Sequence, residues 1–302
     1  MTAELTPSKA ANTILRWIRA SSGQTTAYTD LDLVREGLPT TPYGKGVKII
    51  KPPMASLIKS SEGMLVCNPK DKSEWGIFVN EDVSLERQRF TIAHELGHFV
   101  LHRAKRLTFN CDKAAVHLSL DDAGAIEREA DEFASNLLMP GDVLRDSITN
   151  KKIDLYLLSD LAKAFGVSFE ALCIRFIRYT EKRAILLHWD NGFLKYEWRS
   201  RSAVLNNTRI RRVCEPTEPL LNTVAADESI LQEWQGIDMP SAVWCVGEQP
   251  YMKLQEFKHS YSSRDRALTL LILEDAEPRS WDNSWNDQRS FDSFDKLTGI
   301  DQ

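Results

Sequence analysis

The chain has 302 residues, of which 42% are hydrophobic and 27% are charged, and its formal net charge is −5. The length allows two domains with a sizeable core, and the composition is that of a soluble globular protein. The negative charge excludes a general attraction to nucleic acid and leaves room only for a local basic patch.

The cysteines and the apolar runs bear on the cellular compartment. The five cysteines are odd in number and lack C-x-x-C spacing, which predicts reduced thiols in a reducing cytoplasm. Glu4, Lys9 and Arg16 interrupt the start, so we expect no signal peptide. No apolar run reaches the length of a membrane span. We therefore expect a cytoplasmic protein that does not enter a membrane.

The first part of the chain predicts helices followed by short strands. Apolar spacing over Lys9–Ala20 predicts an amphipathic helix, and a short helix is expected near Asp32–Glu36. Short strands are expected over Gly46–Ile50, Gly63–Cys67 and Trp75–Asn80. Residues 76–79 are the candidate for an edge strand that holds an extended substrate by main-chain pairing; the alternative is a purely supporting sheet.

The stretch from Arg89 to His102, R-F-T-I-A-H-E-L-G-H-F-V-L-H, indicates metal chemistry. His94 and His98 are four residues apart, so on a helix they share one face and can bind one divalent cation. The Glu95 carboxylate between them can act as general base towards a water molecule that the metal activates. A surface helix with two ordinary histidines is the alternative. Apolar residues on most sides of this helix favour a buried, metal-binding one.

A second helix can supply the third ligand. Residues 125–140, A-I-E-R-E-A-D-E-F-A-S-N-L-L-M-P, predict an amphipathic helix that ends at Pro140. Glu127 and Asp131 are four apart, so both can face the first helix: Glu127 would bind the metal, and Asp131 would accept the free N–H of a ligating histidine. Glu129 is a rival for the ligand position that helix phase does not exclude.

His102 continues the spacing of the two histidines. Each step of four residues drifts about 40° around a helix, so three ligands along one straight helix would be strained. We therefore expect His102 to support a ligand or the structure rather than to bind the metal. His188 and His259 are expected to be ordinary histidines.

Together, F-T-I-A-H-E-L-G-H, the following L-H, and E-x-x-A-D-x-F-A-x-x-L-L-M-P resemble the ImmA/IrrE family of bacterial metallopeptidases, over roughly residues 40–180. The resemblance implies an α+β fold with a gluzincin-like mini metallopeptidase domain, in which a small sheet accompanies the H-E-x-x-H helix. It implies that His94, His98 and Glu127 bind Zn²⁺, with Mn²⁺ as an alternative, and that Glu95 is the catalytic acid/base.

The same resemblance implies what the protein does. It implies a zinc-dependent endopeptidase that makes site-specific cuts in a protein substrate, a helix-turn-helix repressor or an antitoxin, and so switches on a stress, mobile-element or defence response. One rival is a non-proteolytic regulatory protein that binds DNA or a repressor through the later domains. Another is the catalytic half of a toxin–antitoxin pair.

Residues 157–172 resemble a helix-turn-helix, with Gly166 at the turn and Ser168 as N-cap. Its second helix is largely apolar and offers Glu170, Arg175 and Arg178 as readers of bases or phosphates. A helix that reads a groove needs a polar exposed face, so we favour packing over direct DNA binding, which stays open.

Beyond Lys182 the sequence predicts a C-terminal α+β domain with a core of its own, sensor-like by the family resemblance. Its expected elements are a helix near Leu221–Trp234 and strands over Ala184–Trp189, Phe193–Trp198, Ala242–Val246, Tyr251–Phe257 and Ala267–Leu273. A solvated face is favoured over an anion site for the arginines between 199 and 212. The predicted domains are 1–140 (metallopeptidase), 141–182 (helical), 183–275 (C-terminal) and 276–302 (acidic tail). The oligomeric state is left open.

Overall fold

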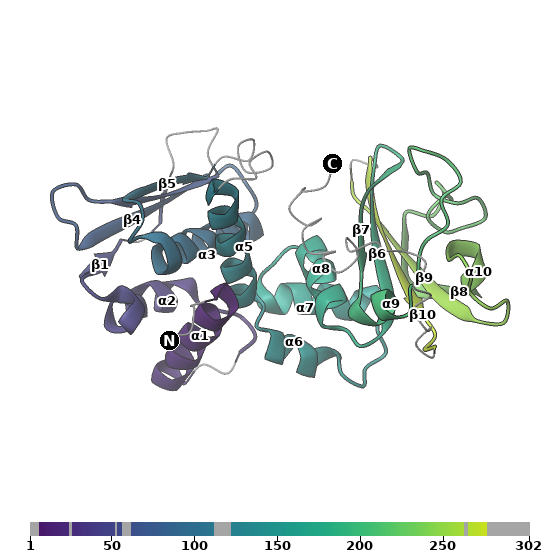
Figure 1. The fold of residues 1–302 in the computed structure, drawn as a ribbon, viewed down its shortest axis with the longest axis horizontal. Helices are drawn as coiled ribbons and strands as arrows, with labels where there is room; N and C mark the ends of the chain where they lie inside the picture. Colours follow the sequence, from purple (N-terminus) through teal and green to yellow (C-terminus); the bar gives the residue numbers. More distant parts are fainter. Residues whose placement is uncertain are drawn as a thin grey trace.

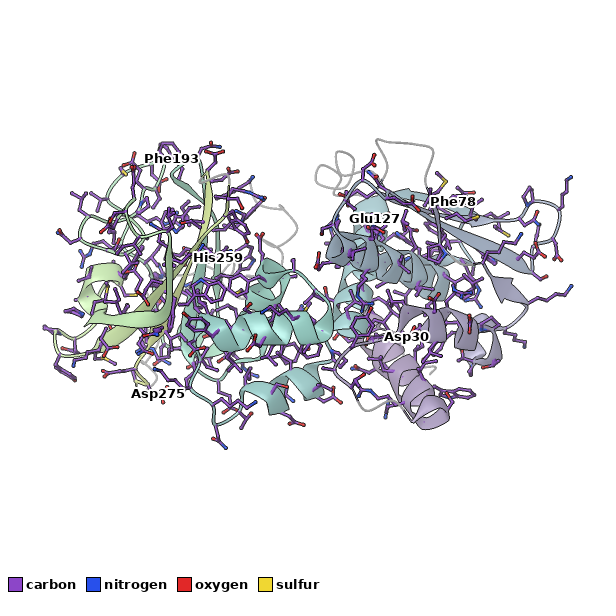
Figure 2. All side chains as sticks on the ribbon, turned by 180° about the vertical axis from the view of Figure 1, so that it is seen from behind. Asp30, Phe78, Glu127, Phe193, His259 and Asp275 are labelled. Atoms are coloured by element: carbon purple, nitrogen blue, oxygen red, sulfur yellow. The ribbon has the colours of Figure 1, made fainter. Side chains whose placement is uncertain are left out.

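A computed structural model describes residues 6–23, 26–51, 53–55, 62–111, 122–262 and 265–276. The chain is elongated, with an N-terminal α+β unit at one end, a C-terminal sheet at the other and three helices between them (Figure 1). Figure 2 shows the same arrangement from behind, with Glu127 in the N-terminal unit and Phe193 and His259 in the C-terminal sheet. The α+β fold class is thus confirmed.

In its described residues, the N-terminal unit joins a mixed sheet to four α-helices. Its strands run in the order β1-β4-β3-β5, and β2 also pairs with β4. Along β3 the side chains alternate between buried and half-buried, as a strand with one face on the core requires. The helices are α1 (Pro7–Ser22), α2 (Leu31–Gly37), α3 (Leu85–His102) and α5 (Asp122–Leu138), with short 3₁₀ turns at Leu38–Thr40 and Pro42–Gly44. The strands are β1 (Ile49–Ile50), β2 (Met54–Ala55), β3 (Gly63–Cys67), β4 (Glu74–Val79) and β5 (Thr108–Cys111).

The prediction that residues 76–79 form an edge strand is wrong. They belong to β4, which pairs with β3 on one side and with β1 and β2 on the other. Strands of two residues beside prolines are too short to show an alternating pattern in the sequence. β5, which pairs antiparallel with β3, ends the sheet instead.

The three middle helices are α6 (Gly141–Ile148), α7 (Leu155–Phe165) and α8 (Phe169–Tyr179). The helix-turn-helix geometry is confirmed: Gly166 ends α7 at a φ of 66°, and Ser168 caps α8 by accepting the amide hydrogen of Ala171. Arg175 is 3% exposed and donates to the Met139 carbonyl, while Glu170 accepts from the Tyr261 hydroxyl. Two of the three candidate readers of DNA are therefore used in packing.

The C-terminal sheet is antiparallel, in the order β7-β6-β10-β9-β8. One continuous cluster of buried side chains extends from α1 through α8 to one face of this sheet, across the predicted boundaries at 140 and 182. A separate cluster covers the sheet's other face. The elements are β6 (Arg183–Asp190), β7 (Phe193–Arg199), α9 (Arg201–Leu205), β8 (Gln232–Pro240), α10 (Ser241–Trp244), β9 (Lys253–Ser260) and β10 (Arg266–Leu273).

Two predicted elements of this domain are wrong. The segment expected as a helix near Leu221–Trp234 is a run of turns followed by the start of β8. The Lys258 ammonium donates to three backbone carbonyls of this run, so tertiary hydrogen bonds decide its path rather than helix propensity. Of residues 242–246, expected as a strand, 242–244 belong instead to α10, whose Trp244 is buried and donates to Glu256, and only Cys245 keeps a single β-bridge, to Ile210.

None of the helices in the described part of the chain combines the length and apolar character that crossing a bilayer needs. Cys67, Cys173, Cys214 and Cys245 take part in no disulfide bond. The predicted acidic tail at 276–302 lies outside the described residues except for Ala276.

Candidate metal centre

Three of the predicted site residues converge where α3 meets α5. His94 and His98, both buried, lie one turn apart on α3, and their Nε2 atoms are 2.9 Å apart. The Glu127 Oε2 atom of α5 lies 3.1 Å from the Nε2 of His94 and 3.4 Å from that of His98. Two imidazole nitrogens and one carboxylate oxygen therefore point at one another.

Close packing of the two helices brings these groups together. Gly97 of α3 faces Ala130 of α5 so closely that a Cβ at Gly97 would lie 3.1 Å from the Ala130 Cα. Ala130 sits one helical turn after Glu127 and next to Asp131, so the same face of α5 that contacts α3 also presents both carboxylates. The small residues at this crossing thus set the distance between the two halves of the site.

Asp131 orients the first histidine. Its Oδ1 atom lies 2.8 Å from the Nδ1 of His94. An ionised carboxylate can only accept, so Nδ1 carries the proton and Nε2 presents its lone pair towards Glu127.

A longer chain of hydrogen bonds orients the second histidine. The Nδ1 of His98 lies 3.1 Å from the Nδ1 of His102, whose Nε2 is 2.8 Å from Oε2 of Glu129. Because the Glu129 carboxylate accepts a hydrogen bond from the Nε2–H of His102, the His102 Nδ1 atom accepts and His98 Nδ1 donates. Glu129, the rival for the ligand position, thus contacts His102.

The donor set fits a metal ion. With both Nδ1 atoms protonated, two imidazole lone pairs and a carboxylate oxygen face one another with no proton to share, an arrangement that a cation stabilises. Ligands at about 2.0–2.1 Å around a tetrahedral zinc ion would lie about 3.3 Å apart. The observed separations of 2.9, 3.1 and 3.4 Å are close to that value. His94, His98 and Glu127 form a group that can hold an ion.

The ionisation states also suit metal binding. Burial lowers the pKa of His98 to about 4, so the ring is neutral at neutral pH and offers a lone pair. Burial likewise lowers the pKa of His102. Burial by itself would raise the pKa of Glu127, but hydrogen bonding to His94 and His98 outweighs it and holds that pKa well below its ordinary value. Glu127 is therefore ionised.

Glu95 is held against the sheet. Its side chain is 0% exposed and lies under Gly63, the first residue of β3. A Cβ at Gly63 would be 2.7 Å from Oε1 of Glu95 and 2.3 Å from Cγ2 of Thr91, so only glycine leaves room here. The sequence did not predict the role of Gly63, because the pattern of a strand does not indicate which helix residue packs against each strand residue.

Phe109 of β5 was also missed. Its ring stacks on the His98 imidazole, with centroids 4.6 Å apart and planes 15° apart. Phe109 is buried and thereby closes the side of the site that faces the sheet edge. A lone aromatic residue within a four-residue strand gives no signal of this contact in the sequence.

Comparisons with known proteins show what the chain is similar to. Residues 45–176 match the family model described as the IrrE N-terminal-like domain. Over 88 residues the chain is 39% identical to metallopeptidase ImmA of Bacillus subtilis (strain 168); the match covers 28% of this chain and 46% of that protein, so the chain spans about half the length of this curated relative. A solved structure, a Mycobacterium tuberculosis transcriptional regulator, superimposes with a TM-score of 0.48 at 15% identity, over 88% of this chain and 75% of that one.

Proposed function

We propose that this chain is a zinc-dependent endopeptidase of the ImmA/IrrE type that makes site-specific cuts in a protein substrate, because residues 45–176 match the IrrE N-terminal-like domain and part of the chain is similar to a metallopeptidase. The observation that carries the proposal is the meeting of two imidazole lone pairs with an ionised carboxylate between α3 and α5.

The side chains of the centre would have three roles: binding the ion, transferring protons and orienting the ligands. His94, His98 and Glu127 would hold the ion; two imidazoles and a carboxylate suit zinc and accommodate manganese. When bound, the ion supplies Lewis acidity that polarises a peptide carbonyl and acidifies water. Glu95 would take a proton from the attacking water and deliver it to the leaving amine. Asp131 and His102 would keep the two imidazoles in the tautomer and orientation that the ion requires.

β5 is the strand we assign to substrate binding. It lies at the edge of the described sheet, and its Phe109 packs on a proposed ligand, so its outer main chain runs beside the metal site. An extended peptide can add to such an edge by main-chain hydrogen bonds. This pairing would bring a peptide bond towards the site and would favour an unfolded or exposed segment of the substrate.

For the substrate itself we extend the proposal to a helix-turn-helix repressor or an antitoxin. The support is the family resemblance of the two motifs. Its cleavage would switch on a stress, mobile-element or defence response, and such a substrate would place the enzyme in the cytoplasm.

The test compares the zinc-loaded chain with its Glu95→Gln variant, each incubated with small helix-turn-helix proteins encoded beside its gene. We expect the wild type to give a few defined fragments by mass spectrometry, whereas Glu95→Gln retains zinc and leaves the same proteins intact. If a variant that cannot cleave still produces the full cellular effect, the rival function as a non-proteolytic regulator that binds DNA or a repressor holds instead.

A further inference from the structure

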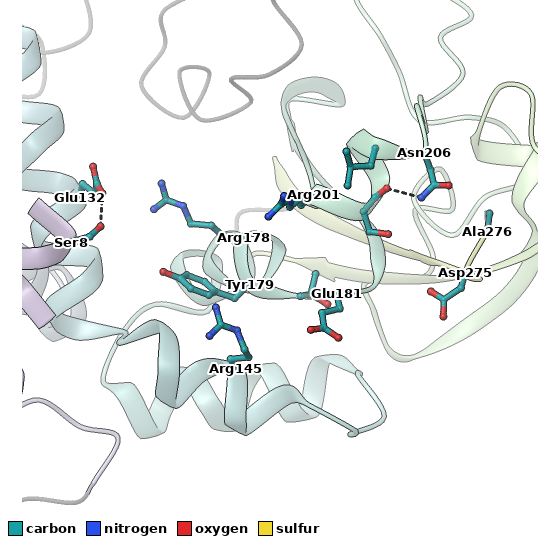
Figure 3. Close-up of a pocket in the computed structure, with 13 residues that line it drawn as sticks. Ser8, Glu132, Arg145, Arg178, Tyr179, Glu181, Arg201, Asn206, Asp275 and Ala276 are labelled. Carbon is teal, nitrogen blue, oxygen red and sulfur yellow. Dashed lines mark hydrogen bonds between the residues drawn. The ribbon is translucent and has the colours of Figure 1, made fainter. Parts of the chain in front are cut away.

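A cavity of about 750 Å³ lies where the three parts of the chain meet (Figure 3). Ser8 and Glu132 line it from the N-terminal unit, and Arg201 lines it from α9. Arg145 of α6 and Arg178 of α8 come from the middle helices. A volume of this size is typical of sites for small molecules, which favour the junctions between domains.

The arginines give the cavity its chemical character. Figure 3 shows the side chains of Arg145, Arg178 and Arg201 reaching from three helices into the space beside Tyr179. Arg145 and Arg201 form no ion pair with any residue that the structure describes. Burial lowers the pKa of Arg178, and Tyr179 and Glu132 offset only part of that shift, so its charge is held partly away from water. An anion would offset that cost, and the guanidinium fork matches phosphate oxygens.

The wall beneath these arginines is fixed. The Tyr179 ring lies so close to the backbone of Gly141 that a Cβ there would be 2.3 Å from the ring's Cε1. The guanidinium carbon of Arg175 is 4.6 Å from the ring centroid, and that of Arg145 is 5.6 Å from it. A rigid wall reduces the entropy that binding a ligand would cost.

Three acidic groups also line the cavity, one of them, Glu132, on the side of Arg178. Glu132 accepts the Ser8 hydroxyl at 2.6 Å, and in Figure 3 Glu181 and Asp275 lie on the side away from Arg178. A simple anion would leave these two carboxylates unused, whereas a ligand that also carries hydroxyl groups could donate to them.

We propose that this cavity binds a small organic phosphate, with the phosphate on Arg145, Arg178 and Arg201 and its hydroxyl groups towards Glu181 and Asp275. The cavity also touches the metal-bearing helix, because Glu132 directly follows Asp131 on α5. An occupant would therefore contact the helix that supplies two carboxylates to the metal centre. Any effect of this ligand on peptide cleavage rests on the proposed function, whereas the binding of the ligand does not.

The test is isothermal titration of the full-length, metal-loaded chain with ribose 5-phosphate and, separately, with pyrophosphate. The double variant Arg145→Gln/Arg201→Gln removes two exposed guanidinium groups and should fold normally. Arg209→Gln is the matched control, because Arg209 is exposed, contacts Asn207 and lies outside the cavity. We expect saturable one-to-one binding of both probes by the wild type and the control, and at least tenfold weaker binding by the double variant.

Two outcomes overturn the proposal: no saturable binding of either probe by the wild type, or equal affinity in the wild type and the double variant. Equal affinity in the two proteins would mean that the phosphate binds at the metal centre and not in the cavity. Neither outcome depends on peptide cleavage, so this experiment does not test the proposed function, which is tested separately.

Discussion

The replacement Gly63→Ala tests how the sheet positions the proposed general base. Gly63 pairs with Val79 on one side and Cys111 on the other, so its backbone is fixed within the sheet. Its added Cβ would lie 2.7 Å from the Glu95 Oε1 and 2.3 Å from a methyl carbon of Thr91. Contacts this short force the Glu95 and Thr91 side chains to move, because α3 is itself packed between the sheet and α5.

The expected magnitudes follow from this geometry. Overpacking at a fixed backbone costs about 1–3 kcal/mol of the free energy of unfolding. A displaced general base loses much of a contribution that is typically 10²–10⁴-fold in kcat. No proposed metal ligand is among the atoms that the new Cβ would meet, so zinc should stay bound. The variant should therefore separate metal binding from chemistry.

The assay measures zinc per chain by atomic absorption and kcat for substrate cleavage. Gly76→Ala is the matched control in the neighbouring strand, since its Cβ would meet Met54 at 3.4 Å and Phe78 at 3.7 Å, which are ordinary contacts. We expect Gly76→Ala to cleave like the wild type. A Gly63→Ala enzyme with zinc bound and a wild-type kcat would refute the reasoning, because Glu95 would then not need its observed position.

Two further predictions concern the helices of the metal centre, and a third concerns α8 where it meets the C-terminal sheet. Gly97→Ala should push α3 from α5, because its Cβ would lie 3.1 Å from the Ala130 Cα, and should weaken zinc affinity in a competition titration. Asp131→Asn and His102→Gln should each weaken that affinity by roughly 10–100-fold, since each disturbs the hydrogen bond that orients a ligand. For Glu170, burial raises the pKa, but His188 and the Tyr261 hydroxyl outweigh it and lower the pKa overall. Its stabilisation is therefore present above the pKa of the unfolded chain, about 4.3, and is lost as pH falls through the lower pKa of the folded chain, so the free energies of urea unfolding of wild type and Glu170→Gln should converge as pH falls below about 4.3.

Local patterns predicted much of the geometry of the candidate metal centre. Spacing of four residues on a helix placed His94 beside His98, and the same spacing placed Glu127 beside Asp131, because helix geometry depends on sequence separation alone. The α7–α8 turn was equally readable, since Gly166 and Ser168 are residues that this turn requires. Where one element determines the arrangement, the sequence was sufficient.

Contacts between elements could not be predicted from the sequence in the same way. Whether Glu127 or Glu129 faced the histidines depended on the rotation of α5 against α3, which the small residues Gly97 and Ala130 determine. The misassigned helix near 221–234 has the same origin, because hydrogen bonds from Lys258 on a distant strand decide the path of that segment. Sequence periodicity carries no information about such partners.

The central claim is that two imidazoles of α3 and one carboxylate of α5 hold a single divalent ion. X-ray absorption at the zinc edge of the zinc-loaded chain tests it directly, with Glu127→Ala measured in parallel. We expect one zinc per chain with two imidazole ligands and oxygen at about 2.0–2.1 Å, and a loss of zinc in the variant. Sulfur ligands at about 2.3 Å, or full zinc occupancy in Glu127→Ala, would contradict it.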